Sequence, residues 1–257
     1  MKKLIHLSDI HLGHADCGEK FRVITEKIIT TMQPASDYIV LITGDIVDNA
    51  NRNDFFTEAL GYIDTLKDSG FRVLVVPGNH DYGSGVLADK KFVKLFKEKF
   101  YNNSHISYPR LDIIDNYAFI GLDSTAEELH WLDRILSEGE LGRRQRLRLK
   151  KMLKLPEVTA CKKIVYLHHH PFDFRIGMQL KDRDKLRKII EGKTDLLLFG
   201  HYHRDHEGSG SYIHGTWGIP RCYNAGTSTH KNGEPGYHRV IDLEATDASN
   251  DFDARLI

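Results

Sequence analysis

The placement of histidine constrains this chain more than any other feature of its sequence. Of the 15 histidines among 257 residues, seven fall in four short clusters that each follow an apolar run. These are His11, His80, the triplet 168–170, and His201 with His203. A short apolar run that ends in polar residues is typical of a buried strand that reaches the edge of its sheet. We therefore expect sheets whose strand ends carry the reactive side chains.

Apolar runs alternate with amphipathic stretches, which is the pattern of a layered α/β protein. We predict strands at Leu4–Ser8, Tyr38–Thr43, Arg72–Val76, Ala118–Leu122, Lys163–His168, Leu196–Phe199, Pro220–Asn224 and Arg239–Leu243. We predict helices at Lys20–Met32, Asp54–Lys67, Leu87–Phe100, Leu141–Leu153 and Arg183–Ile190, the last with Asp182 as N-cap and Gly192 as stop. Without a repeat or a linker-like segment, residues 1–257 are expected to form one domain with mixed sheets.

Composition excludes several classes of protein. With 36 basic and 36 acidic residues, the chain has a formal net charge of zero. This gives no electrostatic reason to expect binding to nucleic acid or to a membrane surface. Three cysteines are too few for a disulfide framework or a thiolate zinc site. No apolar run approaches the ~20 residues that span a bilayer, and the N-terminal run is too short for a signal peptide. We expect a cytoplasmic protein with neither nucleic acid nor membrane as partner.

The spacing of the polar residues points to metal binding. Asp9 and His11 are two residues apart, as are His201 and His203, so in extended chain each pair lies on one face. Glycines at 44, 78 and 200 predict places where the backbone approaches another group closely. Carboxylates, imidazoles and an amide without thiolates favour hard or borderline metals.

The five clusters occur in a familiar order. They are Asp9-x-His11, Gly44-Asp45-x-x-Asp48, Gly78-Asn79-His80-Asp81, the triple histidine before Pro171, and Gly200-His201-x-His203. In this order the chain resembles the calcineurin-like metallophosphoesterase superfamily. The resemblance implies a four-layer α/β/β/α sandwich of two mixed sheets, with two metal ions (Mn, Fe or Zn) at the strand ends.

The resemblance also implies a role for each matching residue. Asp9, His11, Asp45 and His203 would bind one metal ion, and Asn79, His169, His201 and the bridging Asp45 would bind the other. The family usually places its ligand two residues before the proline, which favours His169, and His168 remains the alternative. His80 would protonate the leaving oxygen and Asp48 would orient it, whereas Asp81 would support the loop. Two metal ions would supply a bridging hydroxide that attacks phosphorus in line.

Departures from other branches narrow the expected activity. Asn49 stands where Ser/Thr protein phosphatases carry an arginine. The chain looks most like the compact class III cyclic-nucleotide phosphodiesterases and glycerophosphodiesterases, so we expect a phosphodiesterase acting on a small phosphoester. A broad-specificity phosphomonoesterase, a nuclease that uses the basic segment 143–151, and a metal-retaining scaffold are the alternatives. Candidate substrate contacts are His206, Tyr212, His214 and Trp217.

Overall fold

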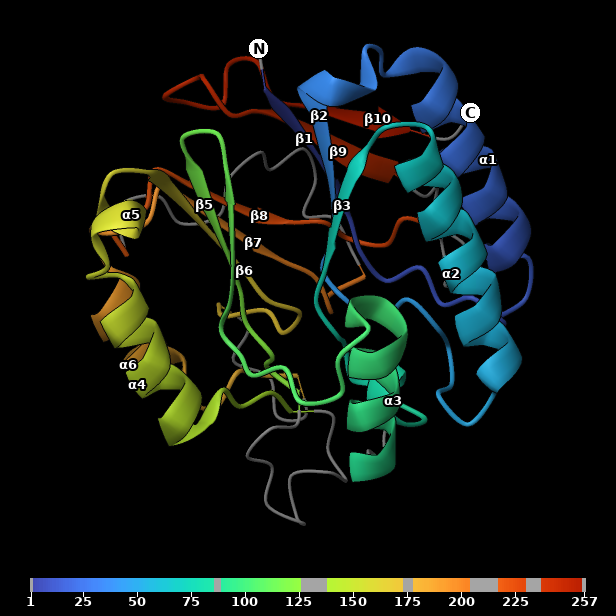
Figure 1. The fold of residues 1–257 in the computed structure, drawn as a ribbon, viewed down its shortest axis with the longest axis horizontal. Helices are drawn as coiled ribbons and strands as arrows, with labels where there is room; N and C mark the ends of the chain where they lie inside the picture. Colours follow the sequence, from blue (N-terminus) through green and yellow to red (C-terminus); the bar gives the residue numbers. More distant parts are fainter. Residues whose placement is uncertain are drawn as a thin grey trace.

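The computed structural model describes residues 2–85, 89–125, 138–172, 178–203, 217–229 and 237–255. Within these residues the strands form two five-stranded sheets (Figure 1). The first sheet has the order β10 (Phe252–Arg255), β9 (Tyr237–Asp242), β1 (Lys3–Leu7), β2 (Tyr38–Ile42) and β3 (Arg72–Val75). The second has the order β4 (Arg110–Ile114), β5 (Tyr117–Gly121), β6 (Lys162–Tyr166), β7 (Leu196–Phe199) and β8 (Arg221–Asn224).

Both sheets are mixed, as the sequence predicts. Strands β1, β2 and β3 run parallel, and β9 and β10 extend that sheet with antiparallel pairs. Strands β5 to β8 run parallel, and β4 pairs antiparallel with β5. Parallel neighbours need long crossover connections, usually through a helix, so helices must cover the sheets.

The helices lie on the two outer sides of the paired sheets. Figure 1 shows α1 (Cys17–Thr31), α2 (Asn53–Asp68) and α3 (Lys90–Tyr101) on one side and α4 (Gly142–Met152), α5 (Pro156–Thr159) and α6 (Arg183–Ile190) on the other. Two short 3₁₀ turns, η1 (Ala35–Asp37) and η2 (His80–Tyr82), complete the described elements. The predicted α/β/β/α sandwich is confirmed.

The buried apolar side chains form three layers. One lies between the first sheet and its helices, and another between the second sheet and its helices. The third lies between the sheets and takes Leu41 from β2 and Tyr166 from β6, both almost fully buried. This middle layer draws on both sheets and so joins them, and a single domain over residues 1–257 stays a prediction.

The predicted elements are all present, with bounds shifted by at most three residues. Leu87, where one predicted helix begins, lies outside the described residues. Strands β4 and β10 and helix α5 were not predicted. Asp182 does precede α6, but its carboxylate accepts the N–H groups of Leu141 and Gly142 at the start of α4, each at 3.1 Å. Gly192, at φ +62°, follows the end of α6 as expected.

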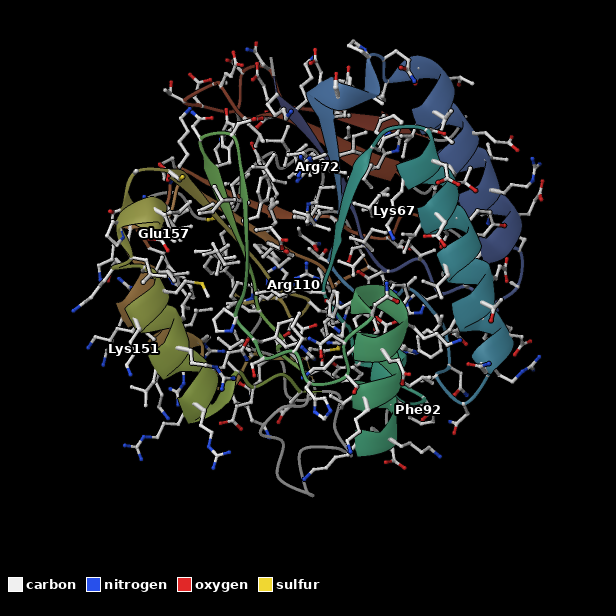
Figure 2. The ribbon with its side chains drawn as sticks, viewed as in Figure 1. Lys67, Arg72, Phe92, Arg110, Lys151 and Glu157 are labelled. Atoms are coloured by element: carbon white, nitrogen blue, oxygen red, sulfur yellow. The ribbon has the colours of Figure 1, made fainter. Side chains whose placement is uncertain are left out.

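The basic segment forms α4 and is largely a solvated helix face. Its apolar stripe is buried, with Leu141 and Leu149 in the core. Figure 2 shows Lys151 on α4 and Glu157 on α5, and both side chains are exposed. Among the described helices, none has the length and apolar character to cross a membrane.

Candidate metal centre

The predicted site residues meet where five parallel strands end. Asp9 and His11 follow β1, Asp45 follows β2, Asn79 and His80 follow β3, the triple histidine follows β6, and His201 and His203 follow β7. In α/β sheets the carboxyl ends of the strands are the usual place for a binding site. Here strands from both sheets contribute, so the site lies across the two.

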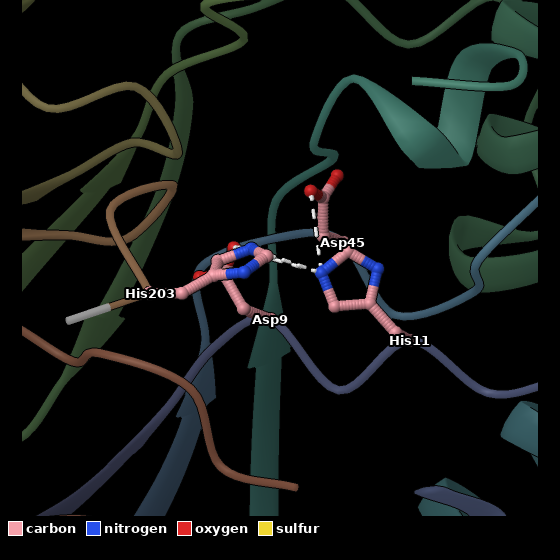
Figure 3. A group of neighbouring side chains, drawn as sticks. All are labelled: Asp9, His11, Asp45 and His203. Carbon is pink, nitrogen blue, oxygen red and sulfur yellow. Dashed lines mark hydrogen bonds and ion pairs between the residues drawn. The ribbon is translucent and has the colours of Figure 1, made fainter. Parts of the chain in front are cut away.

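The first group of side chains comprises Asp9, His11, Asp45 and His203, whose ligand atoms all lie within 4.8 Å of one another. His11 Nε2 is 3.1 Å from His203 Nε2 and 3.9 Å from Asp45 Oδ2. His203 Nε2 is 3.0 Å from Asp9 Oδ1. Figure 3 shows these carboxylates and imidazoles pointing toward one another. Two carboxylates and two imidazoles form a donor set that suits Zn, Fe or Mn.

The second group comprises Asp45, His168 and His201. His168 Nε2 lies 3.1 Å from His201 Nδ1, 3.4 Å from Asp45 Oδ2 and 3.0 Å from Asn79 Oδ1. The Asn79 amide is oriented by its Nδ2, which donates to the carbonyl of Gly85 at 2.9 Å. Its oxygen is therefore the atom that faces the group.

Asp45 belongs to both groups, and a single oxygen of its carboxylate faces both of them. Oδ2 is the atom that approaches His11 on one side and His168 on the other. The other oxygen, Oδ1, accepts the backbone N–H of His80 at 2.9 Å. The carboxylate is thus oriented by the third strand's loop while Oδ2 stays directed at the two groups.

The structure brings His168, the alternative, to the position expected of His169. His168 follows the alternation of Ile164 and Tyr166, which face the opposite sheet, whereas Val165 and Leu167 face the helices. Its Nδ1 faces the Thr43 carbonyl at 2.8 Å, which directs Nε2 at Asp45. The ring of His169 packs against that of His201, with centroids 4.5 Å apart, but its Nδ1 faces Ser124, whose Oγ lies 2.9 Å away. The distances therefore favour His168.

Backbone strain is concentrated in this site. Asp9, His11, Asp45 and His201 all have positive φ, between 49° and 70°. Residues other than glycine rarely adopt this conformation, and strained backbone is often found at functional sites. Each of these residues turns the chain sharply at or just after a strand end, which brings side chains of successive loops to a common point.

Two glycines make this convergence possible, as their positions in the motifs predict. Gly44 has φ +94°, and a Cβ there would lie 2.5 Å from the backbone nitrogen of Gly78. A Cβ on Gly78 would lie 2.2 Å from Asp45 Oδ1. Buried Asp81 joins the same loops by accepting the N–H groups of Ile46 at 2.9 Å and Gly78 at 2.8 Å. This confirms that Asp81 supports the loop.

The electrostatics of the site suit a cation. Burial alone would raise the pKa of Asp45, but the imidazoles of His168, His80 and His11 hold it well below its usual range. Burial lowers the pKa of His168, yet the Asp45 carboxylate outweighs burial and raises it to about 9. The negative charge of Asp45 thus favours a cation beside Oδ2, the atom that faces both groups.

The other donors fit a metal ion as well. Burial, with His169 and His168 nearby, holds the pKa of His201 well below its usual value, so this imidazole is neutral, as a ligand must be. Asp9 Oδ1 is buried and has no hydrogen-bond partner among the described residues, although His203 lies 3.0 Å away. A converging carboxylate oxygen of this kind fits a metal ligand.

His80 and Asp48 lie together, but not through the expected contact. The His80 side chain is 18% exposed, and its Nδ1 lies 2.7 Å from the backbone carbonyl of Asp48. The Asp48 carboxylate is 3.9 Å from the same nitrogen and only 3.4 Å from His11 Nδ1. The main chain of Asp48, rather than its side chain, therefore orients His80.

The loop after β8 supports the site through contacts with the loop after β1. Thr227 Oγ1 donates to the carbonyl of Asp9 at 2.9 Å, and the N–H of Ser228 donates to Ser8 at 2.9 Å. Trp217 is buried and packs against Phe172, with ring centroids 4.9 Å apart, so it does not present an open face. His206, Tyr212 and His214 lie outside the described residues.

Comparisons with known proteins identify the family and the fold of the chain. The family model for calcineurin-like phosphoesterases matches residues 2–205. A probable cyclic nucleotide phosphodiesterase of Fibrobacter succinogenes is 26% identical over 224 residues, covering 79% of this chain and 73% of that protein. One of Coxiella burnetii is 26% identical over 216 residues, covering 79% and 77%. The solved structure of an archaeal phosphodiesterase shares the fold, with a TM-score of 0.51 and 14% identity over 99% of each chain.

His168 and His169 give a first prediction. His168→Ala removes an imidazole that faces Asp45 and Asn79, so we expect about one metal ion per chain in place of the two of a dinuclear centre. His169→Ala is the matched control. It should keep its metal because its Nδ1 faces Ser124 Oγ and its ring only packs against that of His201. Elemental analysis after gel filtration measures both. Metal loss confined to His169→Ala would reverse the assignment.

Two glycines give a second prediction. In Gly78→Ala the new methyl group collides with the Asp45 carboxylate, so we expect loss of metal binding and, as for other overpacked sites, about 1–3 kcal/mol of destabilisation. Gly61→Ala is the control, because nothing lies within 4 Å of that exposed position in α2. It should gain roughly 0.5–1 kcal/mol from the better helix former. Denaturant unfolding and metal analysis test both, and normal metal content in Gly78→Ala would contradict the packing argument.

Proposed function

The chain belongs to the calcineurin-like phosphoesterase family, and from this premise we propose that its metal centre hydrolyses a phosphodiester of a small substrate. The enzyme is a metal-dependent phosphoesterase. The observation that carries the proposal of two metal ions is the position of Asp45, which belongs to both groups of ligand atoms. Its Oδ2 faces His11 at 3.9 Å and His168 at 3.4 Å.

Each metal ion would have its own set of ligands in addition to Asp45. Asp9, His11 and His203 would hold one ion, and Asn79, His168 and His201 the other. When bound, a pair of such ions supplies a nucleophile at neutral pH and stabilises the charge on the entering and leaving oxygens. The manganese, iron or zinc ions of the initial expectation all match the oxygen and nitrogen donors of the two groups.

A cyclic nucleotide is the substrate class that we propose. Two relatives are named probable cyclic nucleotide phosphodiesterases. Asn49 also supports a small diester, because it replaces the arginine that protein phosphatases carry at the matching place. Glycerophosphodiesters offer the same chemistry, a diester with an alkoxide leaving group.

His80 is the residue that we propose as proton donor to the leaving oxygen. Its Nδ1 lies 2.7 Å from the Asp48 carbonyl, and a carbonyl can only accept, so Nδ1 carries a proton in the resting enzyme. The proton that can leave is therefore the one on Nε2 of the charged ring. The ring is 18% exposed, which leaves it within reach of a bound substrate.

We propose the cytoplasm as the compartment of the enzyme. Cys17, Cys161 and Cys222 are free thiols, and Cys17 and Cys222 are buried. A reducing compartment preserves thiols in this state.

The role of His80 gives a third prediction, which also tests the activity. Wild-type enzyme should hydrolyse cyclic nucleotides and bis-p-nitrophenyl phosphate. Because p-nitrophenolate leaves without a proton and a ribose alkoxide does not, His80→Ala should lose much more activity on the cyclic nucleotide. General acid catalysis is worth roughly 10²–10⁴-fold, and we expect a differential loss in that range.

The control for this experiment is the metal content of the variant, which should match that of the wild type. Equal losses on both substrates with metal bound would assign His80 to substrate positioning instead. A wild-type enzyme that cleaves phosphomonoesters and leaves both diesters intact would contradict the proposed phosphodiesterase activity.

A further inference from the structure

Asp48 is surrounded by imidazole nitrogens from the loops after β1 and β3. From this geometry we infer that the Asp48 carboxylate is a positioning residue for the metal ligand His11, and not for His80. This inference rests on the dinuclear centre of the proposed function. It separates the side chain of Asp48, which faces His11, from its main chain, which faces His80.

The two nitrogens of His11 face different partners. Nδ1 lies 3.4 Å from Asp48 Oδ1. Nε2 lies on the other side of the ring, 3.1 Å from His203 Nε2 and 3.9 Å from Asp45 Oδ2. His11 is completely buried, whereas the Asp48 side chain is 27% exposed. Nε2 is therefore the ligand atom, and Nδ1 is the atom that the carboxylate approaches.

A carboxylate at this place has a definite effect on a ligand. It keeps the proton of the neutral ring on Nδ1, so that the lone pair of Nε2 is directed at the metal ion, and it makes the ring a stronger donor. Removing such a partner typically weakens metal binding by about 10- to 100-fold. We expect that loss only at the group that contains His11.

The backbone holds the two residues in register. The loops after β1 and β2 continue to pair in parallel beyond the strands, with a bridge between Leu12 and Val47. His11 N donates to the carbonyl of Asp45 at 3.0 Å, and Asp48 N donates to that of Leu12 at 2.9 Å. The approach of Asp48 to His11 is therefore built into the main-chain pairing.

The contact with His80 has a different origin and survives a substitution. His80 Nδ1 lies 2.7 Å from the backbone carbonyl of Asp48 and 3.9 Å from its carboxylate. A change of the Asp48 side chain removes the carboxylate and keeps the carbonyl. Variants at position 48 thus distinguish support of the metal ligand from support of the proton donor.

The test is a titration of metal-free protein with Mn²⁺ by calorimetry. The wild type should show two binding steps, and His203→Ala marks the step that belongs to the first group. We predict that Asp48→Ala weakens this step by roughly 10- to 100-fold and leaves the other unchanged. Asp48→Asn keeps an acceptor without the charge, so it should show a smaller loss. Circular dichroism checks that each variant is folded.

His14 offers a matched control. Its Nδ1 lies 3.9 Å from the other carboxylate oxygen of Asp48, and its side chain is 40% exposed. It belongs to neither group of ligand atoms, so His14→Asn should leave both binding steps unchanged. With saturating Mn²⁺, Asp48→Ala should also keep the wild-type ratio of rates on cyclic nucleotide and bis-p-nitrophenyl phosphate.

Four results would overturn the inference. The first is an Asp48→Ala variant whose Mn²⁺ affinity is unchanged, or is weakened equally at both binding steps. The second is a fall in the rate ratio like that of His80→Ala, which would mean that the Asp48 carboxylate positions the proton donor His80. The third is a third equivalent of Mn²⁺ that disappears in Asp48→Ala, because the carboxylate would then be a ligand itself. The fourth is a wild type without two binding steps, which would refute the dinuclear centre as well. The first three leave the dinuclear centre intact.

Discussion

The structure depends on a single carboxylate oxygen that faces two groups of imidazoles. Asp45 is buried, and its Oδ2 approaches His11 on one side and His168 on the other. A buried carboxylate is costly unless positive charge is close to it. The surrounding imidazoles hold the pKa of Asp45 well below its usual range, which shows how strongly this point attracts a cation. Two metal ions that share Asp45, as we propose, would satisfy the same demand and would supply the chemistry of a phosphoesterase.

The fold brings the strand ends of both sheets together at this point. Two sheets pack on a shared apolar layer, and their parallel strands end at the same edge. The loops then turn through residues with positive φ and through Gly44 and Gly78, which lie too close to other groups to carry a Cβ. Asp81 connects the loops after β2 and β3. Strain at the strand ends is therefore tolerated because hydrogen bonds and close packing hold each loop in place.

Much of this architecture could be predicted because buried strands are short apolar runs that stop at polar motifs. Strands β4 and β10 escaped prediction because both lie at the edges of sheets, where exposed residues such as Ile113 and Phe252 break the buried pattern. The choice between His168 and His169 depends on the phase of alternation, which Ile164 and Tyr166 reveal only once their neighbours in space are known. The contacts of Asp48 were also not predicted. Sequence does not show that its backbone carbonyl faces His80 while its carboxylate faces His11.

The shared role of Asp45 is tested by the metal content of Asp45→Asn after dialysis against a chelator. The amide keeps one oxygen but loses the charge that both groups share. We predict that the variant loses metal from both positions together, while the wild type keeps about two ions per chain, as a dinuclear centre requires. A variant that retains both ions, or loses only one of them, would contradict the conclusion that Asp45 joins the two halves of the site.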